Sequence, residues 1–189
     1  MDASMKRRQE GFTLIESMVA FVMLVVGLLG VFQLHLTAKR GNHEAFEYTQ
    51  AHALATAIVE RMRLNTRQLS TYVSSSYGSG TFAPPLTSCV SPPTDEPLCN
   101  PQEMAQWDQY VWDQMVAGRN ERLGDRSIGA PVARTGCIAR ADDTVEVVVA
   151  WEGMDQATGN TASDLTTPCG TSSNKRRSIQ LVTTITATP

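Results

Sequence analysis

One carboxylate, Glu16, stands inside an otherwise apolar run near the start of the chain. The 25 residues from Phe12 to Leu36 contain no other formal charge. If the chain were cut after Gly11, a new α-amino group would lie on Phe12, four residues before Glu16, and residues at that spacing share one face of a helix. The amine and the carboxylate could then neutralise each other, within one chain or between neighbouring chains. The spacing therefore predicts an acid–base pair at the start of a helix.

The apolar run has the length of a membrane span. A helix over Phe12–Leu36 would be about 37 Å long, enough to cross a hydrocarbon core of about 30 Å. A charge at the centre of such a helix costs about 2.5–3.5 kcal/mol, which indicates a functional role for Glu16, although a position near the membrane interface would also explain it. Lys6, Arg7 and Arg8 precede the run and predict a cytoplasmic start and an exported remainder. No A-x-A-like cleavage site follows, so we expect the segment to be retained.

The motif KRRQEGFTLIE, followed by the apolar run SMVAFVMLVVGLLGVFQL, resembles the class III signal of type IV prepilins and type II secretion pseudopilins. In that family a membrane peptidase, the prepilin peptidase, cuts after the glycine, here Gly11, and methylates the new N-terminal residue, here Phe12. The family's glutamate, here Glu16, guides an incoming subunit by pairing with the N-terminal amine of a neighbour in the filament. The resemblance implies a cleaved leader over residues 1–11 and a transmembrane, filament-core helix over residues 12–36.

Four further stretches, VERMRLN, CNPQEMAQWDQYVWDQM, GCIAR and VEVVVAW, resemble PilV-type minor pilins, the type IV pilus modification proteins. Major pilins commonly carry a proline about two-thirds through the membrane helix, whereas this segment has Gln33 near that place, which suits a minor subunit. The resemblance implies a subunit that primes pilus assembly with other minor pilins, a tip adhesin, the major pilin and the inner-membrane assembly platform. It also implies twitching motility, adhesion, and a single-pass inner-membrane precursor whose residues 37–189 form a periplasmic domain and later reach the filament at the cell surface.

Two alternative functions share these features. One is a minor pseudopilin of a type II secretion system, which has the same leader and helix. The other is a DNA-uptake minor pilin, in which Lys175, Arg176 and Arg177 would contact phosphates. For that basic run we prefer a solvated start of the final strand. The net charge of −3 also disfavours non-specific binding of nucleic acid.

The residue types of an enzyme or a metal site do not occur in a usable pattern. The sequence has no G-x-S-x-G, H-E-x-x-H or phosphate-loop motif, so no enzymatic activity is expected. His35, His43 and His52 are eight and nine residues apart, which does not give the i, i+4 pair of a helical metal site. Asp142 and Asp143 indicate a hairpin turn and not a calcium loop. We expect neither a metal nor a cofactor.

All four cysteines follow the apolar run and therefore lie on the predicted exported side, where disulfides form. Three pairings exist. We prefer Cys89–Cys99 with Cys137–Cys169, because each bridge closes a loop rich in Pro, Gly, Ser or Thr. The chain-entropy relation gives about 2.7 kcal/mol for the shorter loop and about 3.7 kcal/mol for the longer. Four buried free thiols are the alternative.

The elements that position these residues begin with a continuation of the helix over residues 37–66. Its apolar residues recur at steps of three and four, and its polar residues are expected away from that stripe. The stripe comprises Ala51, Leu54, Ala55, Ile58, Val59 and Met62. Glu47, Gln50 and Glu60 are the residues expected away from it. Gly41 and Asn42 are expected to bend or fray the helix, since glycine costs about 1 kcal/mol in a helix interior.

A loop is expected over residues 70–99, followed by a short helix over 101–117. Asn100 is a residue type favoured at the N-cap, and Pro101 is favoured as the first helical residue. Glu103 completes a capping-box pattern, and Gly118 marks the end of the helix. The face expected to pack on the domain comprises Met104, Trp107, Val111 and Met115. Trp107 is expected in the core, and Trp112 either in the core or at a subunit contact.

The pattern of the last third, residues 132–189, predicts an antiparallel sheet. TVEVVVAW (144–151) and SIQLVTTIT (178–186) alternate with period two, and a weaker strand over 132–139 would join the first of them through a hairpin. Cys169 would tie the long loop between the two good strands back to Cys137. The predicted fold is α+β and type IV pilin-like: a long N-terminal helix packs on an antiparallel sheet, with a short extra helix and disulfide-closed loops.

Overall fold

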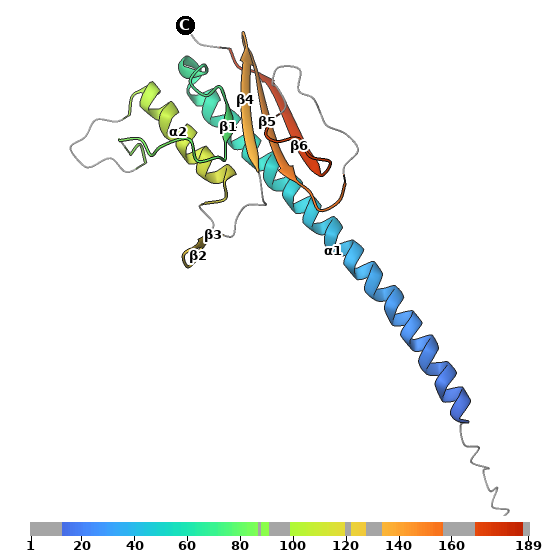
Figure 1. Cartoon of the computed structure of the whole chain (residues 1–189). Helices are drawn as coiled ribbons and strands as arrows, with labels where there is room; N and C mark the ends of the chain where they lie inside the picture. The colour runs from blue at the N-terminus through green and yellow to red at the C-terminus, as the bar shows by residue number, and fades with distance from the viewer. Residues whose placement is uncertain are drawn as a thin grey trace, which may run out of the picture. The chain divides into compact units, whose positions relative to one another are not determined.

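The structure is a computed structural model that describes residues 13–86, 88–90, 99–119, 122–127, 134–156 and 169–186. The chain divides into two compact units, residues 1–43 and residues 44–189. Figure 1 shows the helices and strands, coloured from blue at the N-terminal helix to red at the C-terminal strand. The expected leader, which ends at Gly11, and the expected methylation site Phe12 lie outside the described residues.

Helix α1 (Leu14–Leu64) is continuous through both units. Gly41 and Asn42 are both helical, so the expected fraying of the helix at this point is wrong. Within the first unit, every described side chain from residue 13 to residue 43 is exposed. Among the described residues, α1 is the one helix long and apolar enough to cross a membrane.

The part of α1 in the second unit buries one face, as its periodicity predicts. The stripe residues Ala51, Ala55, Ile58, Val59 and Met62 are buried and Leu54 is half-buried. Glu47 is also buried, which contradicts the expectation that it lies away from the stripe. Its carboxylate tolerates burial because a cation from elsewhere in the chain pairs with it.

The main sheet has the strand order β1-β4-β5-β6, and every neighbouring pair is antiparallel. Its strands are β1 (Ser74–Tyr77), β4 (Thr135–Ala141), β5 (Thr144–Glu152) and β6 (Arg176–Thr184). The predicted β4–β5 hairpin is confirmed, and its turn residue Asp142 has a left-handed φ of 52°. Strand β1 lies inside the segment predicted as a loop, so that prediction is wrong there. Three short elements complete the described part of the second unit: η1 (Thr66–Gln68), β2 (Arg122–Leu123) and β3 (Arg126–Ser127).

Strand β5 is buried on both of its faces. One face packs with the stripe of α1 in the main core and comprises Val145, Val147, Val149 and Trp151. In Figure 1 the second half of α1 passes behind β4 and β5, with α2 (Pro101–Val116) to its side. On the other face, Val148 and Ala150 form a second cluster with the Cys137–Cys169 bridge. The α+β fold expected from the sequence is therefore confirmed.

Helix α2 begins and ends where its punctuation predicts, but it buries a different face. Asn100 accepts hydrogen bonds from the Gln102 and Glu103 amides, and Glu103 accepts one from the Asn100 amide, a complete capping box. Gly118 follows the last turn with a φ of 63°, which favours glycine. The buried face comprises Ala105, Asp108, Gln109, Trp112, Asp113 and Val116. Trp112 is thus the core tryptophan of α2, whereas the apolar face predicted to pack, Trp107 included, is only half-buried.

Candidate functional site

The start of α1 places Glu16 in the first turn of the helix. The Glu16 amide donates to the backbone oxygen of Thr13 (3.1 Å) and to its hydroxyl oxygen (3.4 Å), and the Ser17 amide also donates to the Thr13 carbonyl (3.3 Å). A carboxylate in the first turn interacts favourably with the positive end of the helix dipole. Glu16 itself is exposed, and no described side chain forms an ion pair with it.

Thr13 is a residue that the sequence interpretation missed. The tetrapeptide Thr13-Leu14-Ile15-Glu16 has the S/T-x-x-E pattern of a capping box, and that pattern was the signal that could have revealed it. The structure contains the threonine half of the box, in which the Thr13 hydroxyl accepts from the amide of the third helical residue. The helix start, and with it the position of Glu16, is therefore encoded locally.

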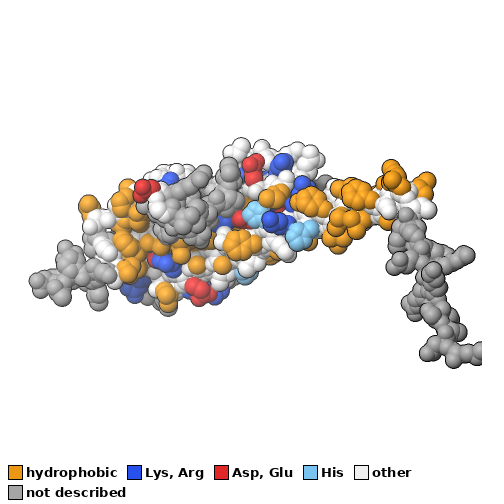
Figure 2. Space-filling view, turned by 90° about the horizontal axis from the view of Figure 1, so that it is seen from below, with side chains coloured by type: hydrophobic (Ala, Val, Ile, Leu, Met, Phe, Trp, Pro, Cys, Tyr) orange, Lys and Arg blue, Asp and Glu red, His pale blue; other side chains and the backbone are white. Residues whose placement is uncertain are grey.

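The N-terminal part of α1 exposes a continuous apolar surface. Large apolar side chains are exposed around the whole circumference, including Phe21, Leu24, Leu28, Leu29, Phe32 and Leu34. Figure 2 shows hydrophobic side chains gathered over this part of the chain. Isolated soluble proteins rarely expose contiguous apolar surface of this extent, so this segment requires lipid or other apolar helices around it.

In the second unit, ion pairs hold α1 to segments far along the chain, and two of them involve glutamates of α1. Arg134 donates to Glu47 Oε2 (2.7 Å) and to Gln50 Oε1 (2.9 Å), and all but a few per cent of its side chain is buried. Arg177 of β6 donates to Glu44 Oε1 at 2.7 Å, with both side chains about 30% exposed. The buried pair is the stronger constraint, because breaking it leaves a charge without compensation inside the domain.

The basic run near β6 has structural contacts. The Arg176 guanidinium is buried and donates to the backbone oxygens of Thr171 (2.6 Å) and Cys169. Burial lowers the pKa of Arg176 from its ordinary value. Arg177 pairs with Glu44, and Lys175 is exposed. The run therefore does not present three free cations to a polyanion. It begins β6 as expected, but the expected solvated position is wrong for Arg176, which is buried.

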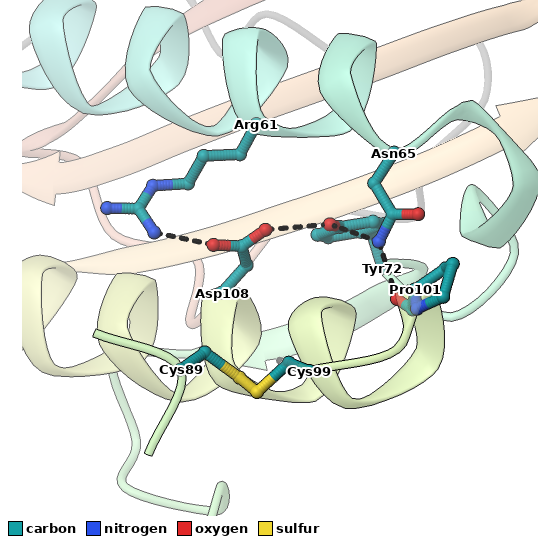
Figure 3. A network of polar contacts seen from close by, with 7 residues as sticks. All are labelled: Arg61, Asn65, Tyr72, Cys89, Cys99, Pro101 and Asp108. Atoms are coloured by element: carbon teal, nitrogen blue, oxygen red, sulfur yellow. Dashed lines mark hydrogen bonds and ion pairs between the residues drawn. A yellow bond between two sulfur atoms is a disulfide. The ribbon is translucent and has the colours of Figure 1, made fainter. Parts of the chain in front are cut away.

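A second polar network joins α1, α2 and the segment between them (Figure 3). Asp108 of α2 accepts from Arg61 on one oxygen (2.5 Å) and from the Tyr72 hydroxyl on the other (2.9 Å). Asn65 donates to the Tyr72 hydroxyl (3.4 Å) and to the backbone oxygen of Pro101 (2.6 Å). Burial, and then the negative charge of Asp108, raises the pKa of the Tyr72 phenol above its ordinary value.

Both disulfides join the pairs that the sequence interpretation preferred. Cys89 and Cys99 are bonded with their Cα atoms 5.6 Å apart, and Cys99 is two residues before the start of α2 (Figure 3). Cys137 and Cys169 are bonded with their Cα atoms 5.8 Å apart, and both residues are buried. The described residues contain no free cysteine. An oxidising compartment suits this pattern.

Comparisons with protein families place these features together. A family model for the prokaryotic N-terminal methylation motif matches residues 6–32, and a model described as Type IV pilin Tt1218 matches residues 33–110. The chain is a type IV pilin-like protein. The comparisons with curated proteins and with solved structures gave no match.

The family match indicates the class of protein to which this chain belongs. Type IV pilins form a family of structural subunits and not of enzymes. In this type IV pilin-like protein, the methylation motif covers part of the leader, Glu16 and most of the apolar helix, which implies processing by a prepilin peptidase and indicates an inner-membrane anchor. The second match begins within the apolar helix and extends through most of α2.

The polar residues on the buried face of α2 form a further part of this pilin-like domain that sequence reasoning missed. Asp113 Oδ1 accepts from the amides of Gly78 (2.7 Å) and Gly80 (3.3 Å). Gln109 donates to the Thr71 backbone oxygen (2.6 Å) and to the Tyr77 hydroxyl (3.1 Å). These partners lie more than 30 residues away in sequence, so helical periodicity could not identify them.

Proposed function

We propose that the chain is a minor pilin that primes the assembly of type IV pili and is incorporated into them. The observation that carries this proposal is the contrast between the two parts of α1. Residues 14–36 expose apolar side chains on every face, whereas the second part of the helix packs its apolar face on its own domain. An exposed apolar helix that extends from a folded domain is suited to packing among equivalent helices.

The N-terminal chemistry follows from Gly11, Phe12 and Glu16. Cleavage after Gly11 and methylation of Phe12 leave a cationic amine four residues from the Glu16 carboxylate. Within lipid or a helix bundle, each of these charges alone is costly, and pairing offsets that cost. Glu16 would therefore select a neighbour whose N-terminal amine is within reach.

The proposed topology has a cleaved leader over residues 1–11, a spanning helix over 12–36 and a periplasmic domain over 37–189. The basic residues Lys6, Arg7 and Arg8 favour a cytoplasmic start. The two disulfides support an oxidising location for the domain. Before assembly the protein would reside in the inner membrane, and afterwards in the filament at the cell surface.

The minor and PilV-type assignment rests on resemblance. The apolar helix has Gln33 near the place where major pilins commonly carry proline. The proposed partners are other minor pilins, a tip adhesin, the major pilin and the inner-membrane assembly platform. With these partners the protein would support twitching motility and surface adhesion.

The first test is the intact mass of the protein from bacterial membranes, measured without reduction. We expect the mass of Phe12–Pro189 plus one methyl group, less the hydrogens of two disulfides. An uncleaved chain that starts near Met1 would overturn the pilin function, because residues 12–36 would then be only an anchor.

The second test compares Glu16→Val with the neighbouring control Ser17→Val. Both variants should be processed normally, but Glu16→Val should be depleted from sheared pili while Ser17→Val is retained. Wild-type abundance of Glu16→Val in pili would refute the pairing role. Recovery of the wild-type protein with secretion complexes, and its absence from pili, would instead identify a pseudopilin.

A further inference from the structure

Helix α1 changes from apolar to basic at the outer end of the proposed membrane span. Large apolar side chains are exposed up to Leu36, and Lys39 and Arg40 follow within the next turn. No Asp or Glu occurs from Ser17 to His43, so this end of the span carries positive charge without a carboxylate beside it on the preceding turns. Such a surface attracts anions.

The spacing places Lys39 at the depth of phospholipid headgroups. A helix rises about 1.5 Å per residue, so Lys39 is about 4.5 Å beyond Leu36. The headgroup layer extends roughly 5–8 Å on each side of the hydrocarbon core. A lysine at this depth keeps its hydrocarbon stem against the apolar layer while its ammonium group lies among phosphates.

The Lys39 ammonium is not used by the chain itself. Lys39 is exposed, and it forms no hydrogen bond or ion pair with any residue that the structure describes. Its neighbour Arg40 does have a contact within the chain, and Glu44 pairs with Arg177. Of the two basic residues that follow the span, Lys39 is therefore the one left for an external anion.

His35 adds a second donor on the same face of α1. It is four residues before Lys39, so the two side chains project from the same side of the continuous helix. His35 is exposed and, in the described part of the chain, its ring nitrogens have no hydrogen-bond partner. It lies about 6 Å deeper than Lys39, at the level of the ester oxygens that join acyl chains to a headgroup. Two donors at these depths match a phospholipid better than a free phosphate ion.

Processing leaves this basic end without a counterpart. Cleavage after Gly11 removes Lys6, Arg7 and Arg8 together with the leader. The lysine and arginine nearest to the span of the processed chain are then both at its outer end. Attraction to anionic lipids is about 1 kcal/mol for each Lys or Arg near the membrane surface.

We propose that Lys39 and His35 bind one anionic phospholipid of the outer leaflet. The ammonium group contacts the lipid phosphate, and the imidazole N–H donates to an ester carbonyl oxygen. The bound lipid holds the waiting subunit at a fixed depth until it enters a filament. This inference rests on the proposed function, which places residues 37–189 in the periplasm.

The test measures the lipids that the purified full chain retains in native mass spectrometry, with phosphatidylglycerol or phosphatidylcholine added to the detergent. We expect preferential retention of phosphatidylglycerol. Lys39→Gln should lower it about fivefold, equivalent to about 1 kcal/mol, and Lys39→Arg should preserve it. Lys175→Gln is the matched control, because it removes an exposed lysine far from the span. It should keep the wild-type retention, and all variants should keep the wild-type unfolding midpoint.

A large excess of inorganic phosphate distinguishes a lipid from a free anion. Phosphatidylglycerol should stay bound in its presence, whereas displacement would show that the site takes free phosphate and would overturn the lipid proposal. Equal retention of the two lipids, or unchanged retention by Lys39→Gln, would also overturn it. The measurement requires neither cleavage nor filaments. An uncleaved chain in bacteria would therefore refute the proposed function and leave the lipid result standing.

Discussion

Two glutamates on the same helix have opposite surroundings. Glu47 is buried and has its cation, Arg134, within the same chain at 2.7 Å. Glu16 is exposed at the first turn, and the described residues provide no ion-pair partner for it. The second part of α1 thus has its charge partner within the folded domain, whereas under the proposed function the first part finds its partner in a neighbouring subunit.

This comparison separates stability from function along one helix. Changes near Glu47 should alter the free energy of unfolding of the domain, because they disturb a folded core. Changes near Glu16 should alter incorporation into filaments and leave that free energy unchanged. Unfolding of the full chain in detergent, measured for matched variants in the two parts of the helix, tests this separation.

The largest effect is expected from Glu47→Leu, with Glu16→Leu as its counterpart. Glu47→Leu leaves the Arg134 cation buried without its charge partner, which should lower the free energy of unfolding by about 3–5 kcal/mol. Glu16→Leu should leave it unchanged, because no described contact is lost. Denaturant unfolding measures both values. Similar losses for the two variants would contradict the proposed division of α1.

The next largest effects come from the disulfides. Replacing Cys137 and Cys169 by alanine opens a loop with a sequence separation of 32, and replacing Cys89 and Cys99 opens one of 10. The chain-entropy relation predicts losses of about 3.7 and about 2.7 kcal/mol, respectively. Because both bridges lie in the second unit, processing at Gly11 should continue in both variants. Unfolding and intact-mass measurements on the same samples check this, and loss of processing would show that the two units are coupled.

Alkaline pH should destabilise the second unit. Burial raises the pKa of the Tyr72 and Tyr77 phenols, so both keep their protons in the folded state at pH values where the unfolded chain, with a phenol pKa near 10, loses them. Their contribution to stability is complete below pH 10 and is lost as the pH rises above it, by up to about 1.4 kcal/mol per pH unit for each tyrosine. Tyr72→Phe should remove one tyrosine's share of this slope. Urea unfolding between about pH 9 and about pH 12 measures it, and an unchanged slope would contradict the prediction.

The smallest effect is expected at the two helix caps. Asn100→Ala removes the side chain that accepts two amide hydrogen bonds at α2 and should cost about 1 kcal/mol. Thr13→Ala removes the corresponding acceptor at α1 but should leave the unfolding of the second unit unchanged. If Thr13→Ala destabilised that unit as much as Asn100→Ala, the first turn of α1 would be part of the domain's folding unit.

Much of the fold could be predicted from local signals. The capping box at Asn100, the alternation over β5 and β6 and the turn at Asp142 are short-range patterns, and each matches the structure. The exposed position of Glu16 in the first turn could also have been derived from Thr13, because an N-cap and its third helical residue are neighbours in sequence. The preferred disulfide pairing followed from the composition of the two loops.

Several of the remaining errors share one physical cause, which is long-range satisfaction of polar groups. Glu47 was expected to be solvent-facing because its cation lies 87 residues away. Asp113 and Gln109 are buried because they bond backbone groups more than 30 residues earlier. Strand β1 has the composition Ser-Ser-Ser-Tyr, and its pairing with β4 outweighs its weak intrinsic preference for a strand.

The contacts of the second part of α1 have a mechanical consequence. Within the described residues, hydrogen bonds fasten the helix along the stretch from residue 44 to residue 63. The fastening residues elsewhere in the domain include Arg177, Arg134, Trp112, Asp108 and Thr183. These residues belong to α2, to β6 and to the approach to β4. A pulling force applied through the helix would therefore be shared by attachments from distant parts of the sequence, so failure of one attachment would transfer load to the others before the helix left its domain.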